Sequence, residues 1–279
     1  MNAMDSEMSI ATHGVRFSYV ITYRSDQGMR AANLRAVLHW LSEIPGIEVL
    51  LVEQDRTPRV TIETLPSNCT HYFVYNEGPF NKAWGLNVGF KYSCGTVVGF
   101  GDADLVINAA TLTACYDWCS SEFEAVKPYD QLVDLTPEES RSVLDGDWNF
   151  KASRNGLQQN REEIGEYVCF CGGIFLMRRG IYEELGGLDE RFLGWGGEDD
   201  AMTAKLSRLA KHCAVARNRI AYHLWHERST SSRYLHSHYQ QNLARTKWYA
   251  ACDIQSLMLL CQQDRQSMGK SDKYGPYKF

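Results

Sequence analysis

The chain has 279 residues, of which 44% are hydrophobic and 23% charged, and its mean hydropathy is -0.37. This composition is typical of one soluble globular domain, and no apolar run approaches the ~20 residues that span a bilayer. The formal net charge of -5 comes without clusters of Lys and Arg, so nucleic acid is not an expected partner.

The nine cysteines are an odd number scattered along the chain, which favours reduced thiols and a cytoplasmic location. The pairs Cys169/Cys171 and Cys115/Cys119 lack the repeated spacing of a structural zinc site, so we interpret them as small buried hydrophobic side chains. Residues 1–12 contain no apolar block after a basic start, and a secretory signal is therefore not expected.

In the first half of the chain, predicted strands alternate with predicted helices. Short apolar runs predict the strands, and apolar residues at i, i+3, i+4 and i+7 from Leu34 to Leu41 predict a helix that ends before Pro45. The predicted strands are 17–22, 48–52, 71–75 and 96–100, and a second helix is predicted at 81–92. This alternation predicts an α/β fold with a mostly parallel, Rossmann-like sheet flanked by helices.

The second half shows weaker patterns. Residues 127–165 are rich in polar residues, Pro and Gly, so we expect a long insertion of loops and short helices that shapes a substrate cleft. Further elements are predicted as a strand at 168–177, a helix starting near 198 and a C-terminal helix at 243–260. The segments 1–14 and 270–279 are expected to be flexible.

An Asp-x-Asp motif follows the strand predicted at 96–100. Asp102 and Asp104 point to the same side of extended backbone, so both carboxylates can face one cation. A Mg²⁺ or Mn²⁺ ion that also binds phosphate oxygens needs such an arrangement, and ligands of parallel sheets bind beyond the carboxyl ends of the strands. The alternative is an acidic turn whose side chains bond their own backbone.

Two histidines three residues apart follow a second apolar stretch. His223 and His226 could complete a metal site begun by a carboxylate, because a neutral imidazole nitrogen is a metal ligand. A core position is an equally good explanation for His223. His226 borders a polar loop and is the better candidate ligand.

The segment Gly194-Trp195-Gly196-Gly197-Glu198-Asp199-Asp200 combines a flat ring with three acids. Acids at the start of a helix are favoured by the helix dipole and need no functional explanation by themselves. A carboxylate beside Trp195 could, however, remove the proton of an attacking sugar hydroxyl. The dipole lowers a carboxylate pKa, so a base here would need burial or acidic neighbours to raise it.

Other nucleotide-binding classes lack their motifs. The chain has no phosphate loop of the Gly-x-x-x-x-Gly-Lys-Ser/Thr form and no Gly-x-Gly-x-x-Gly fingerprint after its first strand, which excludes ATPase and nicotinamide-dependent interpretations. Two alternatives remain. One is a nucleotidyltransferase, although Arg24 and Arg30 do not make a triphosphate loop. The other is a catalytically silent sugar- or nucleotide-binding subunit of a polysaccharide assembly complex.

Five ordered blocks extend over residues 19–228. They are Phe80-Asn81-Lys82-Ala83 with Leu86-Asn87-Val88-Gly89-Phe90, Asp102-Ala103-Asp104, Gly172-Gly173-Ile174-Phe175, the segment from Gly194 to Asp200, and His226. In this order they resemble the β-1,4-galactosyltransferases and related bacterial capsule glycosyltransferases. The block from Gly194 to Asp200 is the most specific of the five.

The resemblance implies one GT-A domain over residues 1–279, with a nucleotide-sugar-binding half at 15–126 and an acceptor-binding, catalytic half at 127–262. It implies an inverting enzyme that uses Mn²⁺ (or Mg²⁺) to move a sugar from a UDP-sugar to a hydroxyl of a glycan. A lipid-linked capsule or lipopolysaccharide precursor would be such an acceptor. The enzyme would then act at the inner face of the membrane, associated peripherally with a membrane-bound assembly complex.

The resemblance also assigns roles to individual residues. Metal ligands would be Asp104, His226 and His223, the last in place of a third ligand that is often methionine. The donor side would comprise Tyr23, Arg24 and Asp26 beside the uridine, Asp102 near the ribose, and Asn81, Lys82, Gly172 and Gly173. Asp199 would be the general base, with Glu198 and Asp200 holding the acceptor and Trp195 contacting both sugars.

Phe170 lies near the donor's C2 group by position, and its bulk slightly favours a galactose-like donor over an N-acetylated one. Residues 127–165 do not align well with the family, so the resemblance leaves the acceptor open.

Overall fold

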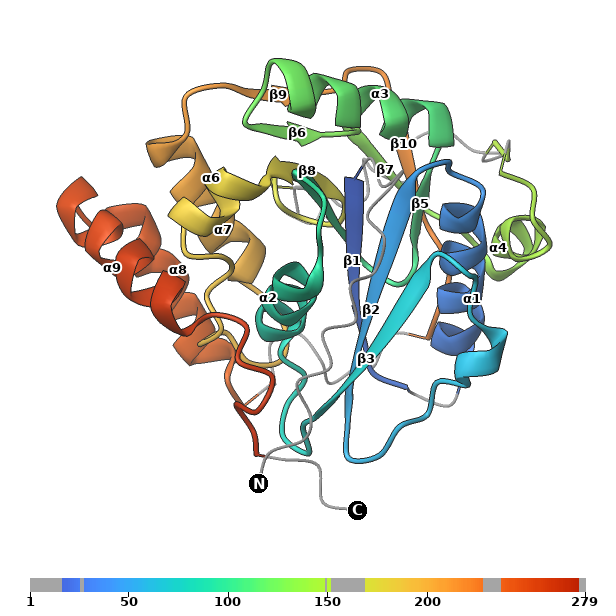
Figure 1. Ribbon diagram of the computed structural model, residues 1–279, viewed down its shortest axis with the longest axis horizontal. Coiled ribbons are helices and arrows are strands. Elements are labelled where there is room, and N and C mark those ends of the chain that lie inside the picture. Colours follow the sequence, from blue (N-terminus) through green and yellow to red (C-terminus); the bar gives the residue numbers. More distant parts are fainter. Residues whose placement is uncertain (1–16, 26–27, 149, 152–168, 228–236, 276–279) are drawn as a thin grey trace, which may run out of the picture.

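The computed structural model describes residues 17–25, 28–148, 150–151, 169–227 and 237–275 (Figure 1). A larger sheet has the strand order β3-β2-β1-β4-β8-β6-β9, and a smaller one has the order β5-β10-β7. The strands are β1 (Phe17–Tyr23), β2 (Ile47–Asp55), β3 (Cys69–Tyr75), β4 (Val97–Gly101), β5 (Leu105–Ile107), β6 (Ala125–Lys127), β7 (Gln131–Asp134), β8 (Phe175–Arg178), β9 (Cys213–Val215) and β10 (Ile220–His223). The helices are α1 (Met29–Ser42), α2 (Lys82–Tyr92), α3 (Ala109–Ser121), α4 (Pro137–Leu144), α6 (Arg179–Glu184), α7 (Glu198–Leu209), α8 (Tyr239–Ala251) and α9 (Ile254–Ser267), with a 3-10 turn η1 (Ile62–Thr64).

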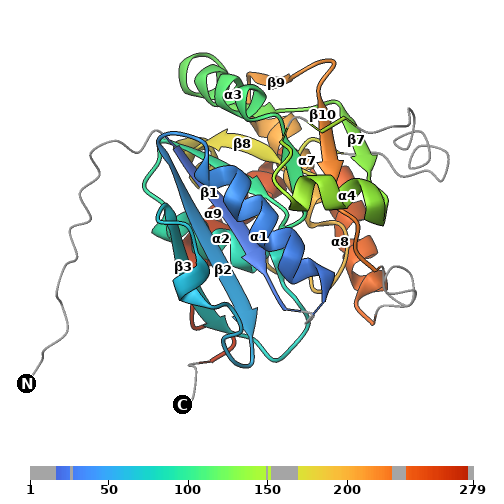
Figure 2. The same ribbon diagram turned by 90° about the vertical axis from the view of Figure 1, so that its right-hand side faces the viewer.

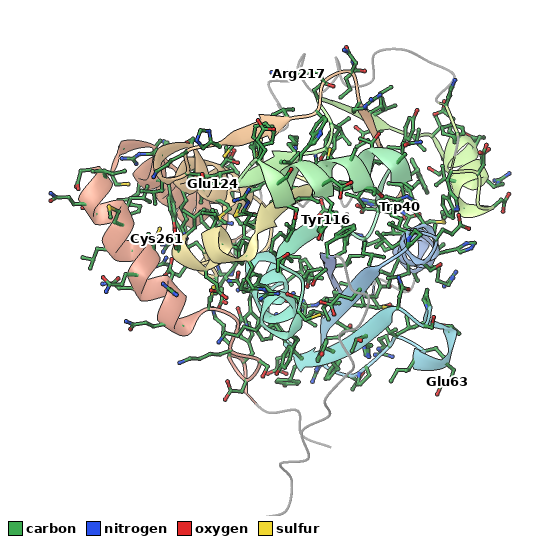
Figure 3. All side chains as sticks on the ribbon, turned by 45° about the horizontal axis from the view of Figure 1, so that its top comes forward. Trp40, Glu63, Tyr116, Glu124, Arg217 and Cys261 are labelled. Atoms are coloured by element: carbon green, nitrogen blue, oxygen red, sulfur yellow. The ribbon has the colours of Figure 1, made fainter. Side chains whose placement is uncertain are left out.

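The central strand β1 is buried on both faces. Tyr19 packs on the side of α1 and α3, whereas Val20 packs on the side of α2, α6 and α7. On the first side, Phe17 stacks on Tyr116 with ring centroids 4.5 Å apart, and Tyr19 meets Trp40 edge-on at 6.2 Å. Figures 1 and 2 show α1 and α2 on opposite faces of the sheet, and Figure 3 labels Trp40 and Tyr116. Successive side chains of β1 point to opposite faces of the sheet, so this strand packs against a layer of helices on each face.

The strand order reverses beside β1. This strand pairs in parallel with β2 on one side and with β4 on the other, so the carboxyl ends of β1 and β4 lie together. Ligands of open α/β sheets bind at such a reversal. Tyr23 closes β1 and Asp102 follows β4, which places both at this point.

The sheet is mostly parallel, as predicted, but β8 runs antiparallel to both β4 and β6. The predicted strand at 168–177 is shorter than expected: β8 begins at Phe175 because the preceding residues 169–174 form the loop that carries Gly172.

The part of 127–165 that the structure describes is more regular than expected. It contains β7 and then α4, which begins with a capping box between Thr136 and Glu139. Residues 152–165 of the expected insertion lie outside the described ranges.

The predicted helix at 243–260 is in fact two helices, α8 and α9. The chain breaks at Cys252, and the Asp253 side chain caps α9 by accepting from Ser256 N at 2.8 Å. None of the helices in the described ranges combines the length and the apolar character that crossing a bilayer requires.

The described part of the C-terminal segment 270–279, expected to be flexible, packs against α2. Trp84 Nε1 donates to the Lys270 carbonyl at 2.7 Å, and Asn81 Nδ2 donates to the Tyr274 hydroxyl at 2.8 Å.

Candidate functional site

Asp104, His223 and His226 meet at the edge of the smaller sheet. Asp104 precedes β5, whereas His223 ends β10 and His226 follows it. β5 and β10 pair antiparallel with Leu105 opposite His223, and Leu224 N donates to the Asp104 carbonyl at 2.8 Å. This pairing places the Asp104 carboxylate 3.6 Å from His223 Nε2 and 3.3 Å from His226 Nε2.

Both imidazoles present Nε2 to Asp104 because Nδ1 is engaged elsewhere. Nδ1 of His223 lies 3.0 Å from Asp134 Oδ1, and Nδ1 of His226 lies 3.0 Å from the Glu227 carbonyl. Both partners accept hydrogen bonds, so neutral rings with the proton on Nδ1 would offer both Nε2 lone pairs to a metal ion. One carboxylate oxygen and two imidazole nitrogens, all within 4.8 Å of one another, suit a divalent metal ion.

The pKa of Asp104 reflects how closely the three side chains interact. Burial acts to raise this pKa, but the charge on His223 and the hydrogen bond from His226 outweigh burial and lower it to about 2. The same hydrogen bond raises the pKa of His226. Asp104 is therefore ionised throughout the physiological range, as a metal ligand must be.

Lys82 connects the Asp-x-Asp motif with the acidic block of α7. Its Nζ lies 2.7 Å from Asp102 Oδ1 and 3.9 Å from Glu198 Oε1. Burial acts to lower the pKa of Lys82, but Asp102, Glu198 and Asp199 more than compensate and raise it. Lys82 is thus a permanent cation between the two motifs, which the structure brings together from distant parts of the chain.

The acids of the most specific block form the first turn of α7, as predicted, after Gly197 with a φ of +96°. Burial, followed by the charge of Asp199, raises the pKa of Glu198 to about 8 and also raises that of Asp200. Burial therefore outweighs the helix dipole at these two residues. Glu198 Oε2 is buried and has no hydrogen-bond partner among the described residues. Both raised pKa values reflect burial and the crowding of acids around Asp199.

The loop of Trp195 is fixed at its base. The buried side chain of Asn242 on α8 donates to the carbonyls of Leu193 at 3.0 Å and Trp195 at 3.1 Å. Gly194 N donates to the Phe80 carbonyl at 2.8 Å. Trp195 itself is 43% exposed, so the indole is presented to solvent above an anchored backbone.

Buried Lys127, at the end of β6, holds the loop that precedes β8. Its Nζ lies 2.9 Å from the Cys169 carbonyl, 3.2 Å from that of Phe170 and 2.8 Å from that of Gly172. An ammonium group has three N–H donors, and these three carbonyls use all of them. Lys127 therefore holds three successive points of the loop with one side chain.

Tyr129 fixes the same loop from the second side. Its hydroxyl donates to the Gly172 carbonyl at 2.8 Å and accepts from Ile174 N at 3.2 Å. Gly173 has a φ of +72°, and a side chain there would collide with the Tyr129 hydroxyl. A Cβ at Gly172 would lie 3.3 Å from Asp199 Oδ2, so the loop runs directly beside Asp199.

Lys127→Met is expected to lower the free energy of unfolding by about 1–3 kcal/mol, because buried carbonyls lose their donor. Burial lowers the pKa of Lys127 from 10.5 to about 8. Between about pH 8 and about pH 10.5, Lys127 is protonated in the unfolded chain but mostly neutral in the folded protein. Raising the pH over this range therefore destabilises the unfolded chain relative to the folded protein, and the free energy of unfolding increases. Urea unfolding at about pH 7 and about pH 9.5 should show a smaller rise in the variant than in the wild type.

Lys205→Met is the matched control. Lys205 is also buried, and its Nζ donates to the carbonyls of Leu185 and Gly187, both at 2.9 Å, away from the loop. Both variants should unfold more easily, but only Lys127→Met should weaken binding of a nucleotide sugar. Wild-type stability of Lys127→Met at both pH values would contradict the role assigned to its ammonium.

Arg24, assigned to the donor side, is committed to main-chain carbonyls. It donates to Gln54 at 2.8 Å, Gly78 at 2.7 Å and Asn76 at 2.8 Å. Its guanidinium thus organises the loops at the carboxyl ends of β2 and β3. Tyr23 is buried beside it at the end of β1. Asp26 lies outside the described residues.

Asn81, also assigned to the donor side, is completely buried. Its side chain accepts from Trp84 N at 2.9 Å and so caps α2, and it donates to the Glu190 carbonyl at 2.9 Å as well as to Tyr274. Asn81 therefore sets the start of α2, and with it the position of Lys82, and its assignment to the donor side stays a prediction.

Cys169 lies beside Asp199 and Asp200, with potential ligand atoms within 4.8 Å of one another. Burial raises the pKa of its thiol, and the two carboxylates raise it further. The neutral, buried thiol agrees with the prediction that this cysteine packs as a small hydrophobic side chain.

Sequence reasoning missed Asp134, Lys127 and Asn242. The alternation of Gln131 to Asp134 followed by the capping-box sequence from Thr136 is a strand-to-helix signal that could have located Asp134 at a strand end. Lys127 and Asn242 carry no comparable local signal.

Two family models match the chain. A model of the glycosyl transferase family 2 matches residues 19–186, and one described as the N-terminal domain of galactosyltransferase matches residues 159–227. Human chondroitin sulfate N-acetylgalactosaminyltransferase 1 is 25% identical over 171 residues, which is 56% of this chain and 29% of that protein. The chain thus spans less than a third of the length of this curated relative.

Among solved structures, residues 1–349 of S. aureus TarS in complex with UDP-GlcNAc align with a TM-score of 0.56 at 16% identity, over 93% of this chain and 75% of that one. A mutant of Drosophila β-1,4-galactosyltransferase 7, in complex with manganese, UDP-Gal and xylobiose, aligns with a TM-score of 0.46 at 16% identity, over 81% and 74%. The alignment with TarS confirms the GT-A fold implied by the sequence resemblance.

Proposed function

The chain belongs to the glycosyl transferase family 2, and from this premise we propose an inverting, metal-assisted transfer of a hexose from a UDP-sugar to a sugar hydroxyl. One observation carries the proposal. The Lys82 ammonium joins Asp102 to Glu198 in the acidic first turn of α7, and Asp104 of the same Asp-x-Asp motif forms a cluster with His223 and His226.

The metal site would be formed by Asp104 and by Nε2 of both histidines. Imidazole nitrogen suits Mn²⁺ better than Mg²⁺, which prefers an all-oxygen shell with several waters, so Mn²⁺ is the proposed ion. When bound, it supplies positive charge that stabilises the diphosphate leaving group. Lys82, a permanent cation beside Asp102, would add to this charge from the protein itself.

Asp199 is the proposed general base. Its Oδ1 accepts from Asp200 N at 3.1 Å, and its Oδ2 faces the loop at Gly172. In the proposed step, Asp199 takes the proton of the acceptor hydroxyl while that oxygen attacks the anomeric carbon and the bond to the diphosphate breaks. A single displacement inverts the anomeric configuration. Asp200 and the exposed Trp195 would hold the acceptor sugar next to Asp199.

The donor is proposed to be a UDP-hexose of the galactose series, with or without a 2-acetamido group. The preference for plain galactose depended on the bulk of Phe170 beside C2. Phe170 is packed against the buried cluster formed by α2, α6 and α7, so its ring gives no strong argument against an acetamido group. The names of the relatives include both galactosyl and N-acetylgalactosaminyl transfer.

The acceptor is proposed to be a glycan or a lipid-linked saccharide, reached through peripheral association with a membrane-bound complex. The alternative, a catalytically silent binding subunit, would retain the fold without turnover. The enzyme is supported by the two parts that turnover needs, which are a metal-binding cluster with an ionised Asp104 and a carboxylate, Asp199, that can take a proton.

A panel of UDP-sugars tested for thermal protection, with Mn²⁺ and with EDTA, addresses the proposal directly. One UDP-hexose is expected to stabilise the protein by about 2.7 kcal/mol at a hundredfold excess over its Kd, and only with Mn²⁺. NMR of the product from that donor should then show the inverted anomeric configuration. Equal protection in EDTA would contradict the metal-assisted donor site, and protection without any turnover would favour the silent subunit.

A further inference from the structure

His223 lies between two carboxylates from different strands. Its Nε2 is 3.6 Å from Asp104 Oδ1, whereas its Nδ1 is 3.0 Å from Asp134 Oδ1. β10 and β7 pair in parallel, and their register sets His223 directly beside Asp134 at the carboxyl ends of both strands. Strand pairing therefore sets the contact between His223 and Asp134.

The hydrogen bond from Nδ1 to Asp134 has a chemical consequence for Nε2. A neutral imidazole carries one proton, and a carboxylate accepting at Nδ1 keeps that proton there. Nε2 is then left with a lone pair aimed toward Asp104. A half-turn of the ring about the Cβ–Cγ bond would put the carbons Cδ2 and Cε1 where Nδ1 and Nε2 now lie, and the Asp134 hydrogen bond opposes this rotation.

His226 is oriented differently, by the main-chain carbonyl of Glu227 at 3.0 Å from its Nδ1. No side-chain substitution removes that acceptor. Asp134 is therefore the residue through which the orientation of one histidine of the cluster can be changed by mutation alone.

We propose that Asp134 is a positioning residue that fixes the tautomer and the ring orientation of His223 and so sets the affinity of the site for Mn²⁺. This inference depends on the proposed function, because it takes the Asp104 cluster as a metal site. It also gives a role to part of the segment 127–165, which the resemblance to known enzymes leaves without one. Through Asp134, strand β7 of that segment would support the metal site by holding the ring of His223 in place.

The experiment measures binding of Mn²⁺ alone to the full chain, by electron paramagnetic resonance of the free ion. Asp134→Ala is expected to weaken binding about 10- to 100-fold. Asp134→Asn should lose less, because an amide oxygen still accepts from Nδ1. In a His223→Ala background, Asp134→Ala should cause no further loss, since the residue it positions is absent.

Asp130→Ala, at the opposite end of β7, is the matched control. The Asp130 carboxylate accepts from Asn218 N at 3.1 Å and Arg219 N at 3.0 Å, so the variant perturbs the entrance to β10 without touching His223. It should bind Mn²⁺ as the wild type does. An equal loss in Asp130→Ala and Asp134→Ala would overturn the inference, because a general effect on β10 would then explain both.

Nitrogen NMR of labelled histidine gives a readout that does not depend on whether a variant folds. In the metal-free wild type with a neutral ring, His223 is expected to carry its proton on Nδ1. A proton on Nε2 would overturn the inference, as would wild-type Mn²⁺ affinity in Asp134→Ala. If the wild type binds no Mn²⁺, or if His226→Ala binds it undiminished, the metal site itself fails, and the proposed function fails with it.

Discussion

Asp199→Asn is expected to reduce kcat for sugar transfer about 10²- to 10⁴-fold, the range that a positioned general base contributes. Asparagine has nearly the same shape, and its side-chain oxygen can still accept from Asp200 N, so the first turn of α7 should be preserved. An amide cannot take the proton of the acceptor hydroxyl. Steady-state transfer rates, with the donor identified by thermal protection, measure the loss.

The same variant should keep its affinity for the UDP-sugar and for Mn²⁺, because Asp199 is proposed to act on the acceptor side. Asp200→Asn provides the comparison from the same helical turn. It should mainly raise the KM for the acceptor, with a smaller change in kcat. Full turnover by Asp199→Asn would exclude this residue as the base.

Asp104→Asn is expected to lose Mn²⁺ binding and to reduce transfer at least ~10³-fold, since the metal contributes several kcal/mol and each 1.36 kcal/mol is tenfold in rate. Its carboxylate is the negatively charged member of the cluster and faces both imidazoles. A neutral amide oxygen is a much weaker ligand for a divalent cation. Titration with Mn²⁺, followed by transfer assays at saturating donor, checks both effects.

Asp104→Asn must be shown to fold, since its carboxylate also interacts with His223 and His226 in the absence of metal. Asp130→Asn, at the opposite end of the smaller sheet, should leave both Mn²⁺ binding and transfer intact. Undiminished Mn²⁺ affinity in a folded Asp104→Asn protein would remove Asp104 from the metal site, and the chemistry would have to be placed elsewhere.

Local sequence predicts the surroundings of some of the expected site residues but not of others. Asp102, Asp104 and the acids of α7 were located because each follows a recognisable local signal: the end of a buried strand, or a glycine before a helix. Arg24 and Asn81 were read as ligand contacts, yet their polar atoms bond carbonyls, a backbone N–H and Tyr274. A polar residue in a family block looks the same in sequence whether it faces a ligand or supports a loop.

The boundary between α8 and α9 is a second feature that local sequence did not predict. Apolar periodicity over 243–260 continues across Cys252 and Asp253, so one long helix was predicted where α8 and α9 are separate. The Asp253 cap was present in the sequence, three residues before Ser256. The tertiary structure favours the break because α8 packs on α7 while α9 packs on α6, and one straight helix cannot cover both.

Periodicity, turn residues and helix-terminal acids act within a few neighbouring residues, and for this reason the α/β alternation, the Asp-x-Asp motif after a buried strand and the start of α7 could be predicted without coordinates. Two contacts could not be predicted in this way: Lys82 joins the two acidic motifs, and His223 is held between Asp104 and Asp134. The same is true of the hydrogen bonds from buried Lys127 to the loop beside Asp199. These contacts join segments tens of residues apart, and strand pairing, which no local pattern encodes, sets their distances.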